Sequence, residues 1–153
     1  MLSAAGSSTL IAQTTSDTTG RRLDEVVVTA TKFPVKQSLT GKVLTIITKE
    51  QLEKSSGKQL TEVLNTQAGV IVTGAPNTLG SPQTVYLQGA SAGKTLILID
   101  GIPAYDPSGI SSSFDLNLIN TDEVERVEIL KGSQSTLYGS DAVAGVINTT
   151  ART

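Results

Sequence analysis

The sequence predicts an α+β domain that consists of a small mixed β-sheet, short helices and long loops. Short runs of β-branched and apolar residues recur along the chain, and glycine, proline or small polar residues bound each run, as is typical of strands. Two capping signals precede apolar residues at helical spacing. Residues 132–148 mix glycines with small polar residues and end in an apolar run, too regular for a linker and too rich in glycine for an ordinary helix.

The composition argues against several classes of protein. A chain of 153 residues is long enough to bury the core of one domain. A formal net charge of −2 without any basic cluster gives no electrostatic basis for binding nucleic acid. The chain has no histidine and no cysteine, so it lacks the usual general base, the imidazole and thiolate metal ligands, and disulfides. We therefore expect no catalytic residue, no metal site, no cofactor and no enzymatic activity.

The first 33 residues are predicted to form a flexible N-terminal leader, and residues 34–153 a globular domain. Residues 1–22 are rich in serine, threonine and alanine; a trimmed signal peptide and a plain leader both fit them. Residues 24–30 carry three consecutive valines and have high β-propensity without an evident partner. Such a segment suits pairing with the sheet edge of another protein, and the alternative is an edge strand of the domain itself.

Two helices are predicted from capping signals. Residues 43–48 read as a strand because they are apolar and β-branched, and Thr48 with Gln51 forms a capping box for a helix directly after them. Ser56 and Gln59 repeat the same device. The second helix would place three apolar residues on one face, Leu60, Val63 and Leu64.

Strands and turns alternate over the rest of the chain. Strands are predicted at residues 70–73, 85–88, 95–99, 124–130 and 142–148. The strand at 95–99 is apolar on both faces, as expected inside a covered sheet. Residues 74–83 and 102–120 are expected to be irregular, and loops this long in a compact domain are usually functional or mobile.

Residues 89–100 imitate a phosphate-binding loop followed by a strand. The spacing between Gly89 and Gly93 is too short for that loop, and a strand follows where a phosphate-binding loop would open a helix. A hairpin turn accounts for the glycines better, so we expect no nucleotide ligand.

Two signatures in this order resemble the TonB-dependent outer-membrane receptors. Residues 24–30 look like the TonB box, and residues 132–148 look like the end of the plug domain, where a turn, a short helical piece and a last strand precede the barrel. Residues 96–103 and 125–132 are similar to the family's central strand with its turn and to its charged strand. The resemblance runs from residue 24 to about residue 150 and implies the plug fold, with the long loops at its apex.

The resemblance implies three sets of functional residues. The box would bind the C-terminal domain of TonB through Asp24, Glu25, Val26, Val27, Val28, Thr29 and Ala30. Apical loops would touch the substrate through Asn77, Thr78, Leu79, Ser81, Tyr105, Asp106, Ser108, Gly109, Ile110 and Ser111. The charged strand would face the barrel or support the fold through Glu125, Arg126, Glu128 and Lys131.

The same resemblance implies partners and a place in the cell. The plug would sit inside a 22-stranded β-barrel of the outer membrane, normally in the same chain, with its N-terminus in the periplasm. The box and loop sequences look most like cobalamin receptors, so a corrinoid is the expected substrate and a ferric siderophore the alternative. The sequence ends where barrel strands are expected, which fits a fragment or a stand-alone plug. A soluble ligand-binding module is the competing class.

Overall fold

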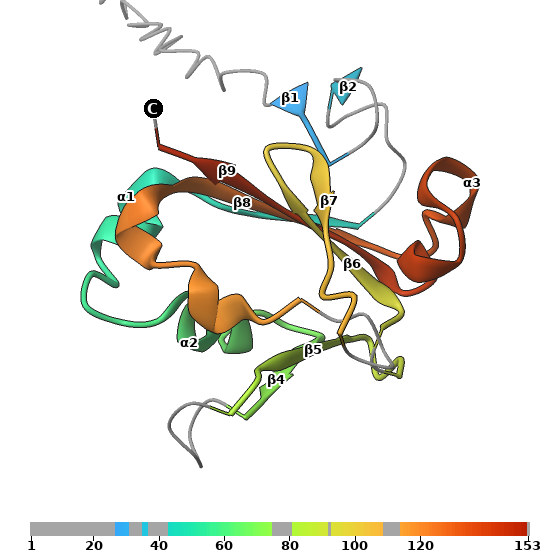
Figure 1. Cartoon of the computed structure of the whole chain (residues 1–153). Helices are drawn as coiled ribbons and strands as arrows, with labels where there is room; N and C mark the ends of the chain where they lie inside the picture. Colours follow the sequence, from blue (N-terminus) through green and yellow to red (C-terminus); the bar gives the residue numbers. More distant parts are fainter. Residues whose placement is uncertain are drawn as a thin grey trace, which may run out of the picture.

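The computed structural model describes residues 27–30, 35–36, 43–74, 81–91, 93–108 and 114–152. Its centre is a five-stranded sheet in the order β3–β8–β9–β6–β7, shown in Figure 1. The strands are β3 (Leu44–Ile47), β6 (Thr95–Ile99), β7 (Ile102–Ala104), β8 (Val124–Lys131) and β9 (Gly145–Ala151). Strands β6 and β9 are parallel and every other neighbouring pair is antiparallel, which confirms the predicted small mixed sheet.

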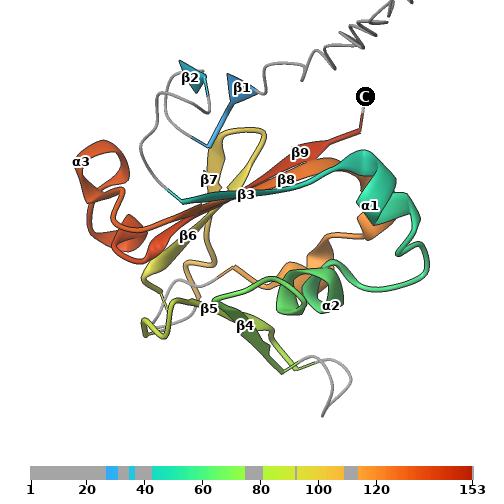
Figure 2. The ribbon, with the colours of Figure 1, turned by 180° about the vertical axis from the view of Figure 1, so that it is seen from behind.

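Two short ribbons extend from this sheet. Strand β1 (Val27–Val28) pairs with β2 (Val35–Lys36), and β4 (Val70–Thr73) pairs with β5 (Thr84–Leu87), both in antiparallel fashion. Figures 1 and 2 show these ribbons on opposite sides of the five-stranded sheet. The connection from β5 to β6 therefore joins two different sheets, and the hairpin predicted around Gly89 is wrong.

The helices are short. They are α1 (Lys49–Glu53), α2 (Leu60–Asn65), α3 (Ser135–Tyr138) and the 3₁₀ helices η2 (Leu116–Leu118), η3 (Thr121–Glu123) and η4 (Ser140–Ala142). The first capping signal is confirmed, because the Thr48 N–H donates to Gln51 Oε1 over 3.0 Å. The second is wrong: α2 starts after Gln59, because Gly57 at φ +85° interrupts any helix that begins at Ser56. In the part of the chain that the structure describes, every helix falls short of the length and hydrophobicity that a membrane-spanning helix needs.

The core lies on both faces of the sheet. On the face that meets α1 and α2, the larger apolar cluster includes Leu52, Leu60, Leu64, Ile97, Val127, Ile129 and Ile147. On the opposite face, a smaller cluster contains Ala30, Leu96, Leu98, Leu130, Ala142 and Val146. Because side chains alternate along a strand, β6, β8 and β9 each contribute to both clusters. The predicted two-faced burial of residues 95–99 is confirmed.

Two strand predictions need correction. Residues 102–104 form β7 instead of an irregular loop. The last strand begins at Gly145, because residues 140–142 form η4 and the chain can approach β8 closely only at a glycine. A Cβ atom at Gly145 would collide with the Leu130 carbonyl oxygen and the Leu87 side chain.

Candidate functional site

Residues 27–30, called the N-terminal segment below, are hydrogen-bonded to the side-chain carboxylate of one residue of the sheet, Glu128. The backbone N–H groups of Thr29 and Ala30 donate to Glu128 Oε2 over 2.7 and 2.6 Å, and the Thr29 hydroxyl lies 3.1 Å from the same oxygen. Hydrogen bonds to an ionised carboxylate are short and about twice as strong as those between neutral groups. Glu128 therefore anchors this segment on strand β8.

Glu128 depends on that segment in return. Its side chain is completely buried, and Oε1 lies 2.9 Å from Arg126 Nη2 in an ion pair whose groups are not aligned for a hydrogen bond. A buried carboxylate destabilises a fold unless it is both paired and hydrogen-bonded. Thr29 and Ala30 supply the hydrogen bonds and Arg126 the opposite charge.

Asn148 on β9 connects the segment to a distant hairpin. Its side-chain amide donates to Thr29 Oγ1 over 2.9 Å, and its Oδ1 accepts the Gly101 N–H over 3.0 Å. The Asn148 side chain is buried, with an exposed fraction of 1%, so both bonds form away from water. The turn of the β6–β7 hairpin is thus two hydrogen bonds away from the N-terminal segment.

That turn has a defined geometry. Asp100 and Gly101 both have positive φ, 51° and 80°, as the two-residue turn that joins twisted antiparallel strands requires. The Asp100 carboxylate accepts the Ala151 N–H over 2.9 Å, and the Asp100 N–H donates to the Thr149 carbonyl. The hairpin turn is therefore fixed to the end of β9.

Tyr138 covers the anchored segment from α3. Its hydroxyl lies 3.4 Å from the Ala30 carbonyl oxygen, and its ring packs against the smaller apolar cluster. Burial raises the pKa of the Tyr138 phenol above its ordinary value. The hydroxyl is protonated at neutral pH, as in any tyrosine, and can donate to the Ala30 carbonyl oxygen.

The predicted TonB box is partly described by the structure. Asp24, Glu25 and Val26 lie outside the described residues. Val27 and Val28 form β1, which pairs with β2, so the prediction that this segment has no partner within the chain is wrong. The partner escaped sequence reasoning because β2 is only two residues long and carries no strand signal of its own.

The predicted loop residues are only partly within the described chain. Asn77, Thr78, Leu79, Gly109, Ile110 and Ser111 lie outside it. Ser81 donates its hydroxyl to the Gly74 carbonyl oxygen over 3.1 Å. Asp106 accepts from the Ser108 hydroxyl and N–H over 2.6 and 2.8 Å, and these bonds hold the pKa of its carboxyl below the ordinary value. Tyr105 is 63% exposed beside them.

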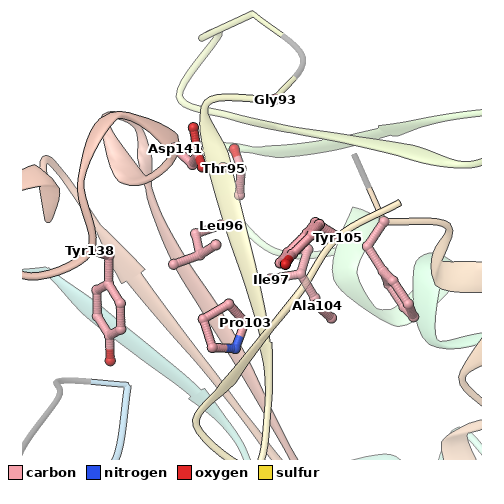
Figure 3. Close-up of a pocket in the computed structure, with 10 residues that line it drawn as sticks. Gly93, Thr95, Leu96, Ile97, Pro103, Ala104, Tyr105, Tyr138 and Asp141 are labelled. Atoms are coloured by element: carbon pink, nitrogen blue, oxygen red, sulfur yellow. The ribbon is translucent and has the colours of Figure 1, made fainter. Parts of the chain in front are cut away.

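A cavity of about 350 Å³ opens beside Tyr105, where the β6–β7 ladder ends (Figure 3). It is lined by Gly93, Thr95, Leu96, Ile97, Pro103, Ala104, Tyr105, Phe114, Tyr138 and Asp141. Figure 3 shows Tyr105 and Tyr138 on opposite sides of β6, with Leu96 and Pro103 between them. A mostly apolar wall with a few polar groups is typical of a small-molecule site. Of the predicted loop residues that are described, only Tyr105 reaches it.

The predicted charged strand divides into different environments. Glu125 is exposed, whereas Glu128 is buried and turned toward the N-terminal segment. Lys131 donates to the Ala68 carbonyl oxygen over 2.6 Å. No group of three or more carboxylates among the described residues is arranged to hold a metal ion.

Sequence reasoning missed the roles of Asn148, Asp100 and Tyr138. A signal existed for Asn148, because an amide directly after the apolar pair Val146 and Ile147 is a polar residue in a buried strand. A signal also existed at Asp100, because Asp-Gly between two apolar runs is a strong hairpin indicator. Nothing local marks Tyr138, whose partner Ala30 lies far away in the sequence.

Comparison with known proteins places this architecture in a family. Residues 36–146 match the model of the TonB-dependent receptor plug domain. The chain belongs to that family, a group of transport components and not of enzymes, so both the predicted resemblance and the predicted absence of enzymatic function are confirmed.

Solved structures agree with this assignment. The siderophore receptor PirA from Pseudomonas aeruginosa is 32% identical, with a TM-score of 0.51 over 72% of this chain and 18% of that one. A variant of the ferric enterobactin receptor PfeA from the same organism is 27% identical, with a TM-score of 0.57 over 83% and 19%. P. aeruginosa FpvA, bound to pyoverdines, is 22% identical and shows the same fold, with a TM-score of 0.62 over 82% and 16%. The chain therefore spans less than a fifth of each receptor.

Proposed function

We propose that the chain is the plug of a TonB-dependent transporter of the outer membrane. In this proposal it sits inside a 22-stranded β-barrel, normally part of the same polypeptide, and gates the path through it. Its N-terminus faces the periplasm, where residues 24–30 recruit the C-terminal domain of TonB. The family match and the small share of each receptor that the chain spans support this arrangement.

The observation that carries the proposal is the placement of Val27–Ala30. Two ladder pairs join β1 to β2 in a separate two-stranded ribbon. Directly after β1, Thr29 and Ala30 attach the chain to the plug through their contacts with Glu128, Asn148 and Tyr138. An isolated two-stranded ribbon is marginal in water, so it is suited to exchanging its partner for another strand. Figures 1 and 2 show the ribbon β4–β5 on the other side of the five-stranded sheet, so in this proposal it would point toward the extracellular side.

We propose a ferric siderophore as the substrate class. PirA is named as a siderophore receptor and PfeA as a ferric enterobactin receptor, and both are more than a quarter identical to this chain. The corrinoid expected from the box and loop sequences stays a prediction without support from these relatives. Of the predicted loop residues, Tyr105 lines the described cavity, and this supports a role of Tyr105 in contacting the substrate.

Binding to TonB tests the recruiting role. We expect amide NMR signals of the labelled chain to shift around residues 24–30 when the C-terminal domain of TonB is added. Val27→Pro should abolish the shifts, because proline removes a backbone donor and restricts the strand. Val27→Thr, which keeps the donor and the β-branched shape, is the matched control and should bind. Equal binding of both variants would contradict recruitment through this segment.

A test of the substrate class requires the whole receptor that contains this plug. Equilibrium dialysis would compare radiolabelled ferric enterobactin with radiolabelled cyanocobalamin on that receptor in detergent. Saturable binding of the ferric chelate, weakened by Tyr105→Ala, is the expected result. Saturable binding of cyanocobalamin alone would reverse the assignment and restore the corrinoid.

A further inference from the structure

We propose that Glu128, assisted by Asn148, is a retention site that holds the N-terminal segment on the plug until TonB takes it. Both are positioning residues: they act on TonB through the conformation of Thr29 and Ala30. The inference rests on the proposed recruiting function and specifies how that function is controlled.

Because of the directions of the Thr29 and Ala30 N–H groups, binding of the N-terminal segment to Glu128 and its pairing with TonB are mutually exclusive. In an extended strand, successive N–H groups point to opposite sides. The N–H groups of Thr29 and Ala30 instead converge on one oxygen, Glu128 Oε2, so the chain is turned at this point and β1 ends at Val28. A partner strand that pairs with the segment through Ala30 must straighten it. Straightening breaks at least one of the two bonds to Glu128.

Glu128 keeps Arg126 as a charge partner after the N-terminal segment is released. Arg126 lies 2.9 Å from the other oxygen, and its side chain is 29% exposed, so it can move with the carboxylate. Its buried Nε has no hydrogen-bond partner in the described part of the chain, which makes it a spare donor for Glu128. Loss of the hydrogen bonds from Thr29 and Ala30 therefore does not leave Glu128 as an isolated buried charge. Two alternative arrangements of one ion pair are what a switch of this kind requires.

Asn148 makes the retained state sensitive to the β6–β7 hairpin. One end of its amide holds the Gly101 N–H in the turn, and the other holds the Thr29 hydroxyl. The far end of the same hairpin supplies Pro103 and Ala104 to the cavity wall. A shift of the hairpin at the cavity changes the position of Asn148 and so the number of bonds that hold Thr29. The fewer bonds hold Thr29, the larger is the fraction of molecules in which the N-terminal segment is released.

Hydrogen exchange of the labelled full chain tests the retention site without TonB. Glu128→Gln removes the charge that shortens both bonds, so the Thr29 and Ala30 amides should exchange at least about tenfold faster relative to amides of the β8–β9 ladder. Their proton resonances should also move upfield as the bonds lengthen. Glu62→Gln, the same charge change at an exposed position of α2, should alter neither. Unchanged exchange at Thr29 and Ala30 in Glu128→Gln would overturn the proposal.

A second pair of variants covers the case in which Glu128→Gln perturbs the whole fold. Asn148→Leu keeps the branched shape of the side chain, with two larger methyl groups, but removes both bonds of the amide. Thr149→Val removes a neighbouring buried hydroxyl that has no partner among the described residues. Faster exchange at Thr29 and Ala30 in Asn148→Leu alone supports the assisting role. Equal effects of the two variants would remove Asn148 from the proposal.

Titration with the C-terminal domain of TonB separates the inference from the function on which it rests. If the retained state competes with TonB, Glu128→Gln should bind TonB several-fold more tightly than the wild type, because the competent fraction rises. Faster exchange of the Thr29 and Ala30 amides in Glu128→Gln, together with an unchanged affinity for TonB, would overturn the retention role and leave recruitment intact. No binding to any variant would contradict recruitment itself.

Discussion

Gly145 shows how one residue fixes the distance between two strands. It has φ +149° at the start of β9, and a side chain there would collide with the Leu130 carbonyl oxygen and with Leu87. The glycine therefore allows β9 to enter the sheet directly beside β8. This contact also explains why the last strand begins three residues later than the apolar run that starts at Ala142.

Gly145→Ala should lower the free energy of unfolding by about 3 kcal/mol, because strain and a backbone collision add. Gly132→Ala is the matched control: φ is +93° there too, but nothing lies within 4 Å of its added Cβ. Its cost should be about 1–2 kcal/mol, from the left-handed backbone alone. Urea unfolding measures both, and equal losses would show that the approach of β8 to β9 can relax.

Tyr138 makes stability dependent on alkaline pH. Since burial raises its pKa, the folded chain holds the phenolic proton more tightly than the unfolded chain does. Its contribution to stability is complete below the unfolded pKa of about 10 and is lost as the pH rises through the folded value. The stability advantage of the wild type over Tyr138→Phe should therefore be constant at neutral pH and shrink as the pH rises above about 10. An advantage independent of pH, measured by urea unfolding, would contradict this.

The burial of Glu128 was not predictable from the sequence. Arg126 and Glu128 alternate with Val127 and Ile129, a pattern that indicates a strand with one solvated face. The structure buries Glu128 because Thr29 and Ala30, nearly a hundred positions away, cover that face. No local spacing reports such a contact.

At the scale of elements, strands with a clear period were predictable and short edge strands were not. The predicted strand at 95–99 coincides with β6, because its branched residues fill both faces of a covered sheet. Strand β7 has three residues, one of them Pro103, so propensity argues against it. Its pairing with β6 is set by the Asp100–Gly101 turn instead.

Strand β6 is expected to tolerate no charge on its helix-facing side. Ile97 is 5% exposed in the larger cluster, so Ile97→Asp would bury an unpaired carboxylate and should unfold the domain. Ile102→Asp places the same residue on the adjoining strand, where the side chain is 70% exposed, and should cost less than about 1 kcal/mol. Circular dichroism and urea unfolding compare the two. A folded, stable Ile97→Asp variant would contradict the placement of β6.

At the scale of the whole molecule, the class of fold was predictable and the order of the strands was not. Short strands, capping signals and turn residues indicate an α+β domain because each is a local property of the chain. The parallel pairing of β6 with β9 joins segments about fifty residues apart, and only the completed core selects it.

The distribution of contacts predicts unequal stability across the molecule. Strands β8 and β9 pair along most of their length at the centre of the sheet, whereas β4 and β5 form a separate ribbon. Amides of Val127 and Ile147 should exchange only on global unfolding, and those of Ile71 and Tyr86 at a lower free energy of opening. Hydrogen exchange in increasing urea distinguishes these classes. A single opening free energy for both sets would show that the ribbon and the sheet unfold together.

The position of β9 also has a consequence for how the chain is made. It follows the other four strands of the five-stranded sheet along the chain, yet it lies in the middle of that sheet. Until a growing chain extends past Gly145, β8 and β6 each expose an unpaired edge, and the five-stranded sheet cannot be completed. The order of synthesis therefore delays completion of the sheet until the chain has passed Gly145, so folding of the five-stranded sheet starts late in the synthesis of these residues.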